Sequence, residues 1–219
     1  LKKTAAVWPA LRRPGPHDWL AHFPEPEQTV EEFLENAPDR AKDPSKGIAL
    51  LPITPLDHET RKTLVVVRHF LEITYQCPVR QLPEIEAPKE FYFRGGSQIN
   101  ARKLLPKLIS RRPEDCWALA AVTGSDLSTP QMNFVFGLSS FTHGVSLSSS
   151  SRFKAPRKSL TRRRLCLTVA HELGHSLGMH HCIAYSCMIN GSNHLDESDA
   201  RPAIFCPHCM AKLKALRGI

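Results

Sequence analysis

Three histidines and a glutamate within one short segment form the most informative pattern in the sequence. Residues 171–181 are His-Glu-Leu-Gly-His-Ser-Leu-Gly-Met-His-His. Because residues four apart on a helix lie only about 40° apart around its axis, His171 and His175 would point to the same side and could bind one metal ion. Neutral imidazole nitrogens are common ligands of Zn²⁺. The spacing therefore predicts a metal site on one face of a helix.

A third ligand and a base complete the predicted chemistry. Gly178 lies where the helix must end if His181 is to return to the metal, and glycine readily adopts the left-handed conformation of such a turn. Three protein ligands leave a fourth position for water, whose pKa a zinc ion lowers while it polarises a carbonyl group. Glu172 would take the proton from that water. We expect hydrolysis of an amide bond; three buried histidines satisfied by hydrogen bonds are the structural alternative.

Four cysteines near the C-terminal end predict a second metal site. They are Cys182, Cys187, Cys206 and Cys209. The last two have the C-x₂-C spacing of half a closed tetrahedral zinc site, so we favour a structural zinc bound by four cysteines. Two disulfides, four free thiols, or the replacement of one cysteine by His194 or His208 are the alternatives.

The expected cellular compartment favours a metal site at these cysteines over two disulfides. The sequence begins Leu-Lys-Lys and continues into Pro-rich sequence without an apolar signal region, so we see no secretory signal and expect an intracellular protein, in the cytoplasm or the nucleus. Clustered thiols bind metal more often than they form disulfides under reducing conditions. Cys77, Cys116 and Cys166 fall within apolar segments and are expected to be buried packing residues.

Hydrophobic periodicity predicts the elements that must position these residues. The metal-binding helix has an apolar back, formed by Cys166, Ala170, Leu173 and Leu177. Before it, we expect strands at 47–54, 77–82 and 117–123 and helices at 57–75 and 98–111, the latter kinked or shortened by Pro106. Alternating strands and helices indicate an α/β fold with a mixed, mostly parallel sheet.

Two further segments lie just before the metal-binding helix. Residues 133–141 alternate between apolar and other side chains, which predicts one strand with an exposed side. Such a strand could pair with an extended ligand backbone, or could simply pack within the sheet. The serines at 148–151 predict a loop.

The N-terminal part of the chain differs from the rest. Half of the 18 prolines lie before Leu56, which predicts an extended arm over residues 1–46 that wraps the core, with one short helix at 29–37. Residues 47–219 would then form the catalytic domain, including a zinc subdomain with four cysteines at 182–212.

Composition and charge restrict the class of protein. Hydrophobic residues make up 42% and charged residues 23% of 219, as in a folded globular chain, and no apolar run is long enough to span a membrane. Lys and Arg number 29 against 21 Asp and Glu, and seven of these cations lie between Arg152 and Arg164. Because no aromatic residues for base stacking interleave with them, we expect a solvated loop and not a nucleic-acid surface. We expect a monomer that acts on a peptide or protein substrate.

With these motifs in place, the chain resembles the archaemetzincins, a branch of the metzincin zinc metallopeptidases. The three histidines and the glycine match the metzincin motif. Cys182 directly after the third histidine, then Cys187 and the Cys-Pro-His-Cys stretch at 206–209, point to this branch. The stretches Asn-Phe-Val-Phe-Gly at 133–137 and Gly-Ser-Asn-His-Leu at 191–195 support it.

The resemblance implies a compact metzincin fold with two zinc ions. The implied catalytic site has His171, His175 and His181 as ligands and Glu172 as the base. The implied structural site is formed by Cys182, Cys187, Cys206 and Cys209. The resemblance also implies that the strand at 133–141 edges the substrate cleft and that the substrates are short peptides, cleaved from the amino end.

One position departs from the family. Metzincins place a methionine beneath the metal, and the archaemetzincin pattern puts it two residues after the second cysteine, where this chain has Ile189 preceded by Met188. Either the turn is shifted by one residue or isoleucine forms the apolar floor. Because this residue supports the ligands without binding zinc, we expect altered catalysis before loss of metal. A zinc-stabilised binding module with little or no turnover is the alternative function.

Overall fold

A mixed sheet forms the centre of the computed structural model, which describes residues 8–43, 45–93 and 95–218. Its strands lie in the order β2 (Val79–Gln81), β1 (Gly47–Thr54), β6 (Cys116–Thr123), β10 (Val145–Ser149) and β9 (Gly137–Ser140), and β3 (Ile85–Glu86) also pairs with β1. All pairings are parallel except that of β9 with β10. The apolar central strands β1 and β6 are buried on both faces, as parallel strands covered by helices should be.

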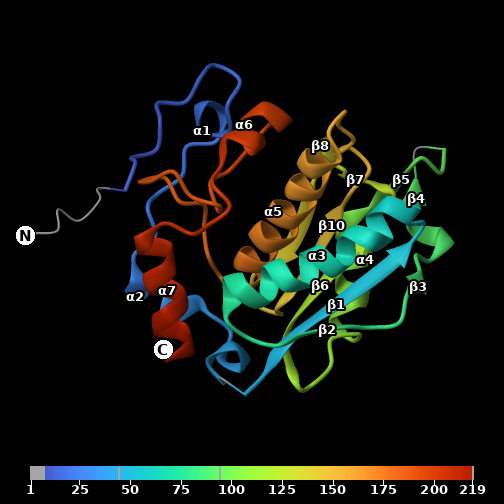
Figure 1. Cartoon of the computed structure of the whole chain (residues 1–219), viewed down its shortest axis with the longest axis horizontal. Coiled ribbons are helices and arrows are strands. Elements are labelled where there is room, and N and C mark those ends of the chain that lie inside the picture. The colour runs from blue at the N-terminus through green and yellow to red at the C-terminus, as the bar shows by residue number, and fades with distance from the viewer. Residues whose placement is uncertain (1–7, 44, 94, 219) are drawn as a thin grey trace, which may run out of the picture.

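Two layers cover this sheet. The helices α3 (His58–Tyr75) and α5 (Lys158–Ser176) lie side by side on one face (Figure 1). On the other face pack α4 (Ala101–Ile109), the short 3₁₀ helix η2 (Lys89–Phe91) and a small sheet of β4 (Tyr92–Phe93), β5 (Gln98–Asn100), β7 (Asp126–Thr129) and β8 (Met132–Val135). Each face therefore has its own hydrophobic core.

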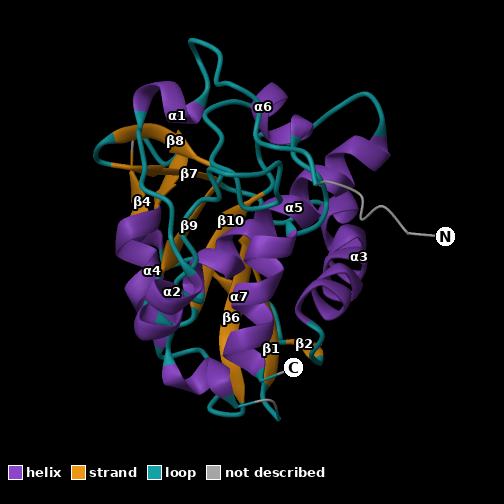
Figure 2. Cartoon of the chain, turned by 90° about the vertical axis from the view of Figure 1, so that its left-hand side faces the viewer, coloured by secondary structure: helices purple, strands orange, loops and turns teal. Residues whose placement is uncertain are grey.

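Part of the N-terminal arm packs against the C-terminal helix beside this sandwich. The C-terminal helix α7 (Pro207–Arg217) contacts α2 (Val30–Asn36) and the 3₁₀ helix η1 (Asp39–Lys42). The short helices α1 (Trp19–His22) and α6 (Leu195–Ala200) lie at the same end of the molecule (Figure 2). None of the helices described is long and apolar enough to cross a membrane.

Most predicted elements are confirmed. The strand at 47–54 matches β1, the helix at 57–75 begins after the cap Asp57, and the helix at 29–37 is α2, whose Thr29 and Glu32 form a capping box. The helix at 98–111 is partly wrong, because residues 98–100 form β5. Asn100 then caps α4 by accepting a hydrogen bond from the backbone N–H of Lys103.

Two predictions before α5 are corrected. Residues 133–141 do not form one strand: β8 belongs to the small sheet and β9 to the central sheet, with Phe136 between them. The backbone turns from one sheet to the other there, which side-chain alternation does not reveal. Ser148 and Ser149 belong to β10 instead of a loop; both are buried, and the hydroxyl of Ser149 donates to the carbonyl oxygen of Ser125.

The basic run is only in part the solvated loop that was expected: residues 152–157 form a loop ahead of α5, and most of the cations of the run are exposed. From Lys158 onward its residues belong to α5. Three of its cations form ion pairs: Arg152 with Asp126, Lys158 with Glu59 and Arg164 with Asp199. Three of its seven cations are therefore paired within the chain.

The predicted N-terminal arm is extended apart from its short helices and lies against the C-terminal segment. Pro9 and Leu11 form backbone hydrogen bonds with Ser186 and Ala184. Residues 1–7 of the predicted arm lie outside the described residues.

Candidate metal centres

The C-terminal part of α5 and the loop that follows it bring the three predicted histidines together. His171 and His175 lie one turn apart, with their Nε2 atoms 3.0 Å from each other. The ring of His181 lies 5.3 Å from that of His171 and 4.6 Å from that of His175, measured between ring centres. One nitrogen from each ring falls within 4.8 Å of the other two. The three histidines that the sequence motif predicts as ligands therefore converge in the structure.

The turn that returns His181 to the helix depends on glycine. Gly178 has a backbone φ of +93°, a region that side chains with a Cβ rarely adopt. Its N–H donates a hydrogen bond to the carbonyl oxygen of His175, which closes the helix. The chain then reverses and presents His181 to the other two rings. The prediction that the helix ends at this glycine is confirmed.

The outer nitrogen, Nδ1, of each ring faces an oxygen atom. Nδ1 of His171 faces the carbonyl oxygen of Met188 at 3.2 Å, and Nδ1 of His175 faces that of Met179 at 2.6 Å. Nδ1 of His181 faces both carboxylate oxygens of Glu25 at 2.9 Å. If each Nδ1 carries the proton toward its oxygen, each Nε2 keeps its lone pair for a metal.

Distance and protonation also fit zinc. Two nitrogens bound tetrahedrally at the usual zinc distance lie about 3.3 Å apart, close to the separation of the first two Nε2 atoms. Burial lowers the pKa of His171 well below its ordinary value and that of His175 to about 3, so both rings are neutral at physiological pH. Neutral imidazole is the form that binds a metal.

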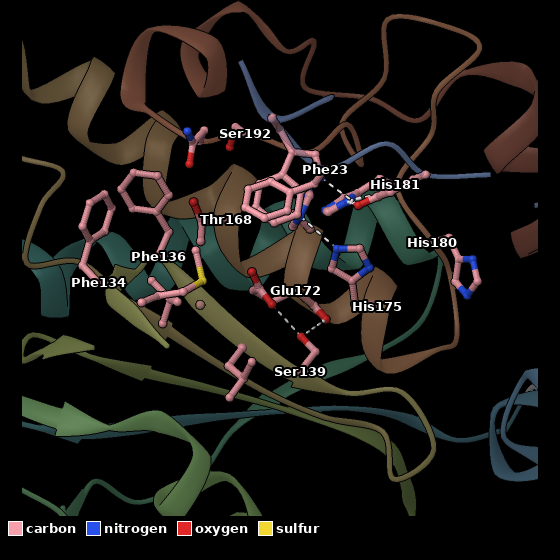
Figure 3. Close-up of a pocket in the computed structure, with 18 of the residues that line it drawn as sticks. Phe23, Phe134, Phe136, Ser139, Thr168, Glu172, His175, His180, His181 and Ser192 are labelled. Atoms are coloured by element: carbon pink, nitrogen blue, oxygen red, sulfur yellow. Dashed lines mark hydrogen bonds and ion pairs between the residues drawn. The ribbon is translucent and has the colours of Figure 1, made fainter. Parts of the chain in front are cut away.

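Glu172 lies beside this group and is held by β9. The Ser139 hydroxyl is 2.6 Å from Oε2 of Glu172 and 2.7 Å from its backbone carbonyl oxygen (Figure 3). A Cβ on Gly137 would collide with the side chain of Glu172, so glycine allows the close approach of strand and helix. Burial raises the pKa of Glu172 to about 7. A carboxylate with this pKa can both accept and return a proton near neutral pH.

Met188 and Ile189 have different roles beneath the histidines. Ile189 packs on α5 at Gly174, where a Cβ would lie 2.6 Å from its Cδ1 atom. Met188 contributes its backbone carbonyl oxygen to His171, and both side chains are fully buried. Isoleucine therefore packs on the metal-binding helix at the position where the family pattern has methionine.

The four predicted cysteines form a second cluster. The sulfur atoms of Cys182, Cys187, Cys206 and Cys209 lie within 4.8 Å of one another and are buried. The sulfurs of Cys182 and Cys206 are 3.7 Å apart, far beyond disulfide length but close to the roughly 3.8 Å of two thiolates on one tetrahedral zinc. His208 instead faces the carbonyl oxygen of Gln28, and His194 faces Asp18. The other three cysteines are buried, as expected.

A cleft of about 750 Å³ opens over the histidines and Glu172. Phe134 and Phe136 lie at one end and His175 and His181 at the other (Figure 3). Thr168, one turn before Glu172 on α5, also lines the cleft, and its buried hydroxyl has no hydrogen-bond partner among the described residues. The cleft can therefore hold an extended chain across the candidate metal site.

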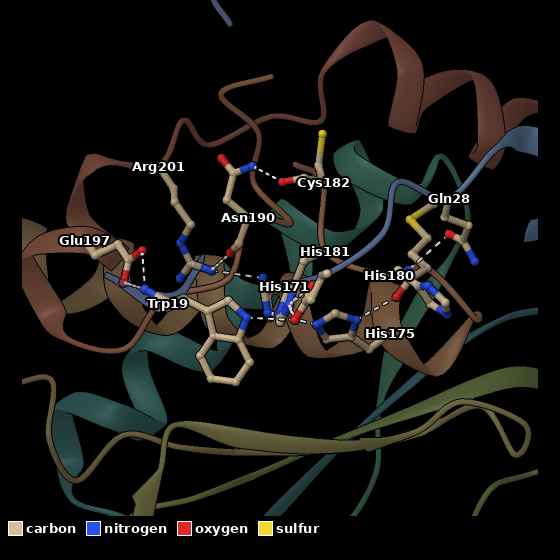
Figure 4. A network of polar contacts seen from close by, with 12 residues as sticks. Trp19, Gln28, His171, His175, His180, His181, Cys182, Asn190, Glu197 and Arg201 are labelled. Atoms are coloured by element: carbon tan, nitrogen blue, oxygen red, sulfur yellow. Dashed lines mark hydrogen bonds and ion pairs between the residues drawn. The ribbon is translucent and has the colours of Figure 1, made fainter. Parts of the chain in front are cut away.

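Several residues around the site were missed by sequence reasoning. The buried guanidinium of Arg201 donates a hydrogen bond to the carbonyl oxygen of Asn190 and lies 2.9 Å from Nδ1 of His171 (Figure 4). Trp19, Phe23 and Glu25 of the N-terminal arm line the cleft. No local spacing could have identified them, because they come from distant parts of the chain. Ser139 lay in a segment expected to edge the cleft but was not singled out.

Comparison with known sequences places these features in a family. The sequence model of peptidase family M54 matches residues 57–215, which include both clusters. Archaemetzincin-2 of Rattus norvegicus is 29% identical over 248 residues, covering 92% of this chain and 68% of that protein. Archaemetzincin of Pyrococcus furiosus is 33% identical over 129 residues, covering 56% of this chain and 67% of that protein.

Solved structures have the same fold. The crystal structure of archaemetzincin from Methanopyrus kandleri superposes with a TM-score of 0.71 at 25% identity, covering 79% of this chain and 96% of that one. The crystal structure of a zinc-dependent peptidase from Methanocorpusculum labreanum superposes with a TM-score of 0.67 at 27% identity, covering 76% of this chain and 100% of that one. The chain belongs to peptidase family M54, the archaemetzincins, and is a zinc metallopeptidase.

Proposed function

We propose that this chain hydrolyses peptide bonds at a zinc ion bound by His171, His175 and His181, with Glu172 as general base. The observation that carries the proposal is the convergence of three imidazoles, each with Nδ1 facing an oxygen, beside a buried carboxylate in one cleft. A zinc ion bound there would polarise the scissile carbonyl group and acidify a water molecule.

Glu172 moves the protons in this scheme. Its carboxylate would accept a proton from the attacking water and return it to the leaving amine, which suits a pKa of about 7. The Ser139 hydroxyl orients the carboxylate by donating to Oε2. Burial keeps bulk water from competing for these groups.

The edge of the central sheet suggests how the substrate binds. In the described part of the chain β9 pairs only with β10, and residues 137–139 line the cleft. An extended peptide could add to this edge through backbone hydrogen bonds, with side chains contacting Phe134 and Phe136. We further propose short peptides cleaved from the amino end. Peptides with acetylated amino ends should then be cleaved more slowly than their free counterparts.

We also propose a second zinc, bound by Cys182, Cys187, Cys206 and Cys209. The sulfur spacing and burial support a closed site without a position for water, which makes it structural. This site follows directly after His181 in sequence, so it would fix the end of the segment that carries the third histidine.

The Glu172→Gln variant tests the catalytic proposal. It keeps the shape of the side chain but removes the base, so we expect two zinc ions per chain, unchanged folding and a loss of peptide hydrolysis by at least about 100-fold. Zinc is counted by atomic absorption and cleavage by mass spectrometry of a peptide mixture. Retained cleavage would remove Glu172 from the mechanism.

A binding module without turnover is the second candidate, favoured by Ile189 at the position of the family methionine. It predicts that fully zinc-loaded unmodified protein cleaves none of a varied set of peptides, including those with free amino ends. It also predicts that the protein still binds some of them, as measured by calorimetry.

A further inference from the structure

Part of the cleft is built by a segment that precedes the matched family region. Residues 57–215 match the M54 family, yet Trp19, Phe23 and Glu25 of the N-terminal arm line the cleft above the histidines. The arm thus contributes to the candidate active site and does not only cover the outside of the fold.

Glu25 makes the closest contact between the arm and the metal centre. Its two carboxylate oxygens each lie 2.9 Å from Nδ1 of His181, and both side chains are largely buried. The other two histidines have backbone carbonyl oxygens at the same position. His181 is therefore the one ring of the three whose outer nitrogen faces a carboxylate, whereas that of His171 also has the guanidinium of Arg201 at 2.9 Å.

The carboxylate of Glu25 is itself held in place. The indole N–H of Trp19 donates to Oε1 of Glu25 at 2.7 Å, and the indole ring lies edge-on to the ring of His181 at 5.3 Å (Figure 4). The backbone N–H of Trp19 donates to Glu197 on α6 at 2.9 Å. A Cβ on Gly191 would collide with the indole, so glycine makes room for it.

The arm is fixed on both sides of this contact. Gln28 donates from its amide to the carbonyl oxygen of Gly178 at 2.9 Å and accepts from the backbone N–H of His180 at 3.1 Å, which holds the turn before His181. On the other side Asp18 faces His194 at 3.1 Å. The close group of Asp18, His194 and Glu197 thus serves to dock the arm, since each member already bonds another protein group.

We propose that Glu25 is a positioning residue of the zinc centre, which the N-terminal arm completes by fixing the ring of His181. A carboxylate that accepts the outer N–H of a histidine fixes the tautomer and orientation of the ring and makes its other nitrogen a stronger ligand. Removing such a partner typically weakens metal binding about 10- to 100-fold. This inference rests on the proposed histidine site but not on catalytic turnover there.

Metal affinity tests the proposal directly. Glu25→Ala and Glu25→Gln are compared with the unmodified chain in competition for zinc with a chromophoric chelator. The matched control is Glu27→Gln, which removes the same charge from an exposed position two residues along the arm. Thermal unfolding of each zinc-loaded variant verifies that it folds. Titration with Co²⁺ separates the two sites, because only the cysteine site gives intense thiolate-to-metal absorption.

We expect Glu25→Ala to weaken zinc binding at the histidine site about 10- to 100-fold, while the cysteine site and Glu27→Gln stay unchanged. The zinc affinity of Glu25→Gln should lie between those of the unmodified chain and Glu25→Ala, since the amide oxygen of glutamine can still accept a hydrogen bond from His181. Trp19→Phe, which removes only the indole N–H, should give a smaller loss than Glu25→Ala.

Equal zinc affinity in Glu25→Ala and Glu27→Gln would overturn the proposal, because Glu25 would then be a simple surface ion pair. Failure of the proposed function gives a different result: the unmodified chain would bind zinc tightly at the histidine site and cleave no peptide. The affinity difference between the variants would still be measurable in that case.

Discussion

Glu172 is oriented by a single hydroxyl from another element, which makes Ser139 a sensitive residue. A hydrogen bond to a charged acceptor contributes about 1.5–3 kcal/mol. Because Ser139 donates to Oε2 of Glu172 in the cleft, Ser139→Ala should lower kcat/KM for peptide cleavage about tenfold or more without changing zinc content. Steady-state kinetics with a fluorogenic peptide measures this.

The neighbouring serine provides the control for that variant. The hydroxyl of Ser140 lies 2.8 Å from Nδ1 of His143, and alternation along β9 points it away from Glu172. Ser140→Ala should therefore leave kcat/KM unchanged. If the two alanine variants lose the same activity, the hydroxyl of Ser139 does not orient the base.

The contact between Gly174 and Ile189 makes a second prediction at the residue scale. Gly174→Ala would bring a Cβ to 2.6 Å from Cδ1 of Ile189, and such overpacking typically costs about 1–3 kcal/mol. Ile189→Val removes that carbon atom and alone costs about 0.5–1.5 kcal/mol. In the double variant the collision disappears, so the free energy of unfolding should fall by less than the sum of the two single changes.

Denaturant unfolding of the zinc-loaded protein and of the three variants gives the coupling energy. Additive effects, within about 0.5 kcal/mol, would mean that Ile189 does not pack on the metal-binding helix at this glycine.

At the scale of elements, local patterns were predictable and changes of direction were not. The helix carrying His171 and His175 has a ligand spacing and an apolar back that both follow from helical geometry. The division of residues 133–141 between β8 and β9 was not predictable, because alternation continues through Phe136 while the chain passes from one sheet to the other. Likewise β5 precedes α4 without a break in the apolar pattern.

The same distinction applies to the candidate site. His171, Glu172, His175 and the cysteine pair at 206 and 209 are identified by short spacings. Glu25 lies far from His181 in sequence, and nothing near it marks it as different from the other acids of the arm. Its position follows only from the docking of the arm on the C-terminal segment, which depends on tertiary contacts.

At the scale of the whole molecule, the two candidate metal centres differ in what surrounds them. The cysteine cluster lies within the larger hydrophobic core, together with Phe205 and Leu213, whereas the histidine cluster opens into the cleft. Asn190 links the two by donating to the carbonyl oxygen of Cys182, in the segment that follows His181. We therefore expect the core to depend on metal at the first site and the proposed chemistry to depend on metal at the second.

Stepwise removal of zinc should separate these two roles. The histidine site offers three ligands and an open position, so a mild chelator should remove its zinc first and abolish peptide cleavage while near-ultraviolet circular dichroism stays unchanged. A stronger chelator that strips the cysteine site should unfold the C-terminal region, because a buried structural zinc contributes directly to folding free energy. Zinc added after the first step should restore cleavage at once, whereas recovery after the second step requires refolding. Loss of tertiary signal together with the first zinc ion would contradict this division, since it would mean that the open site also supports the core.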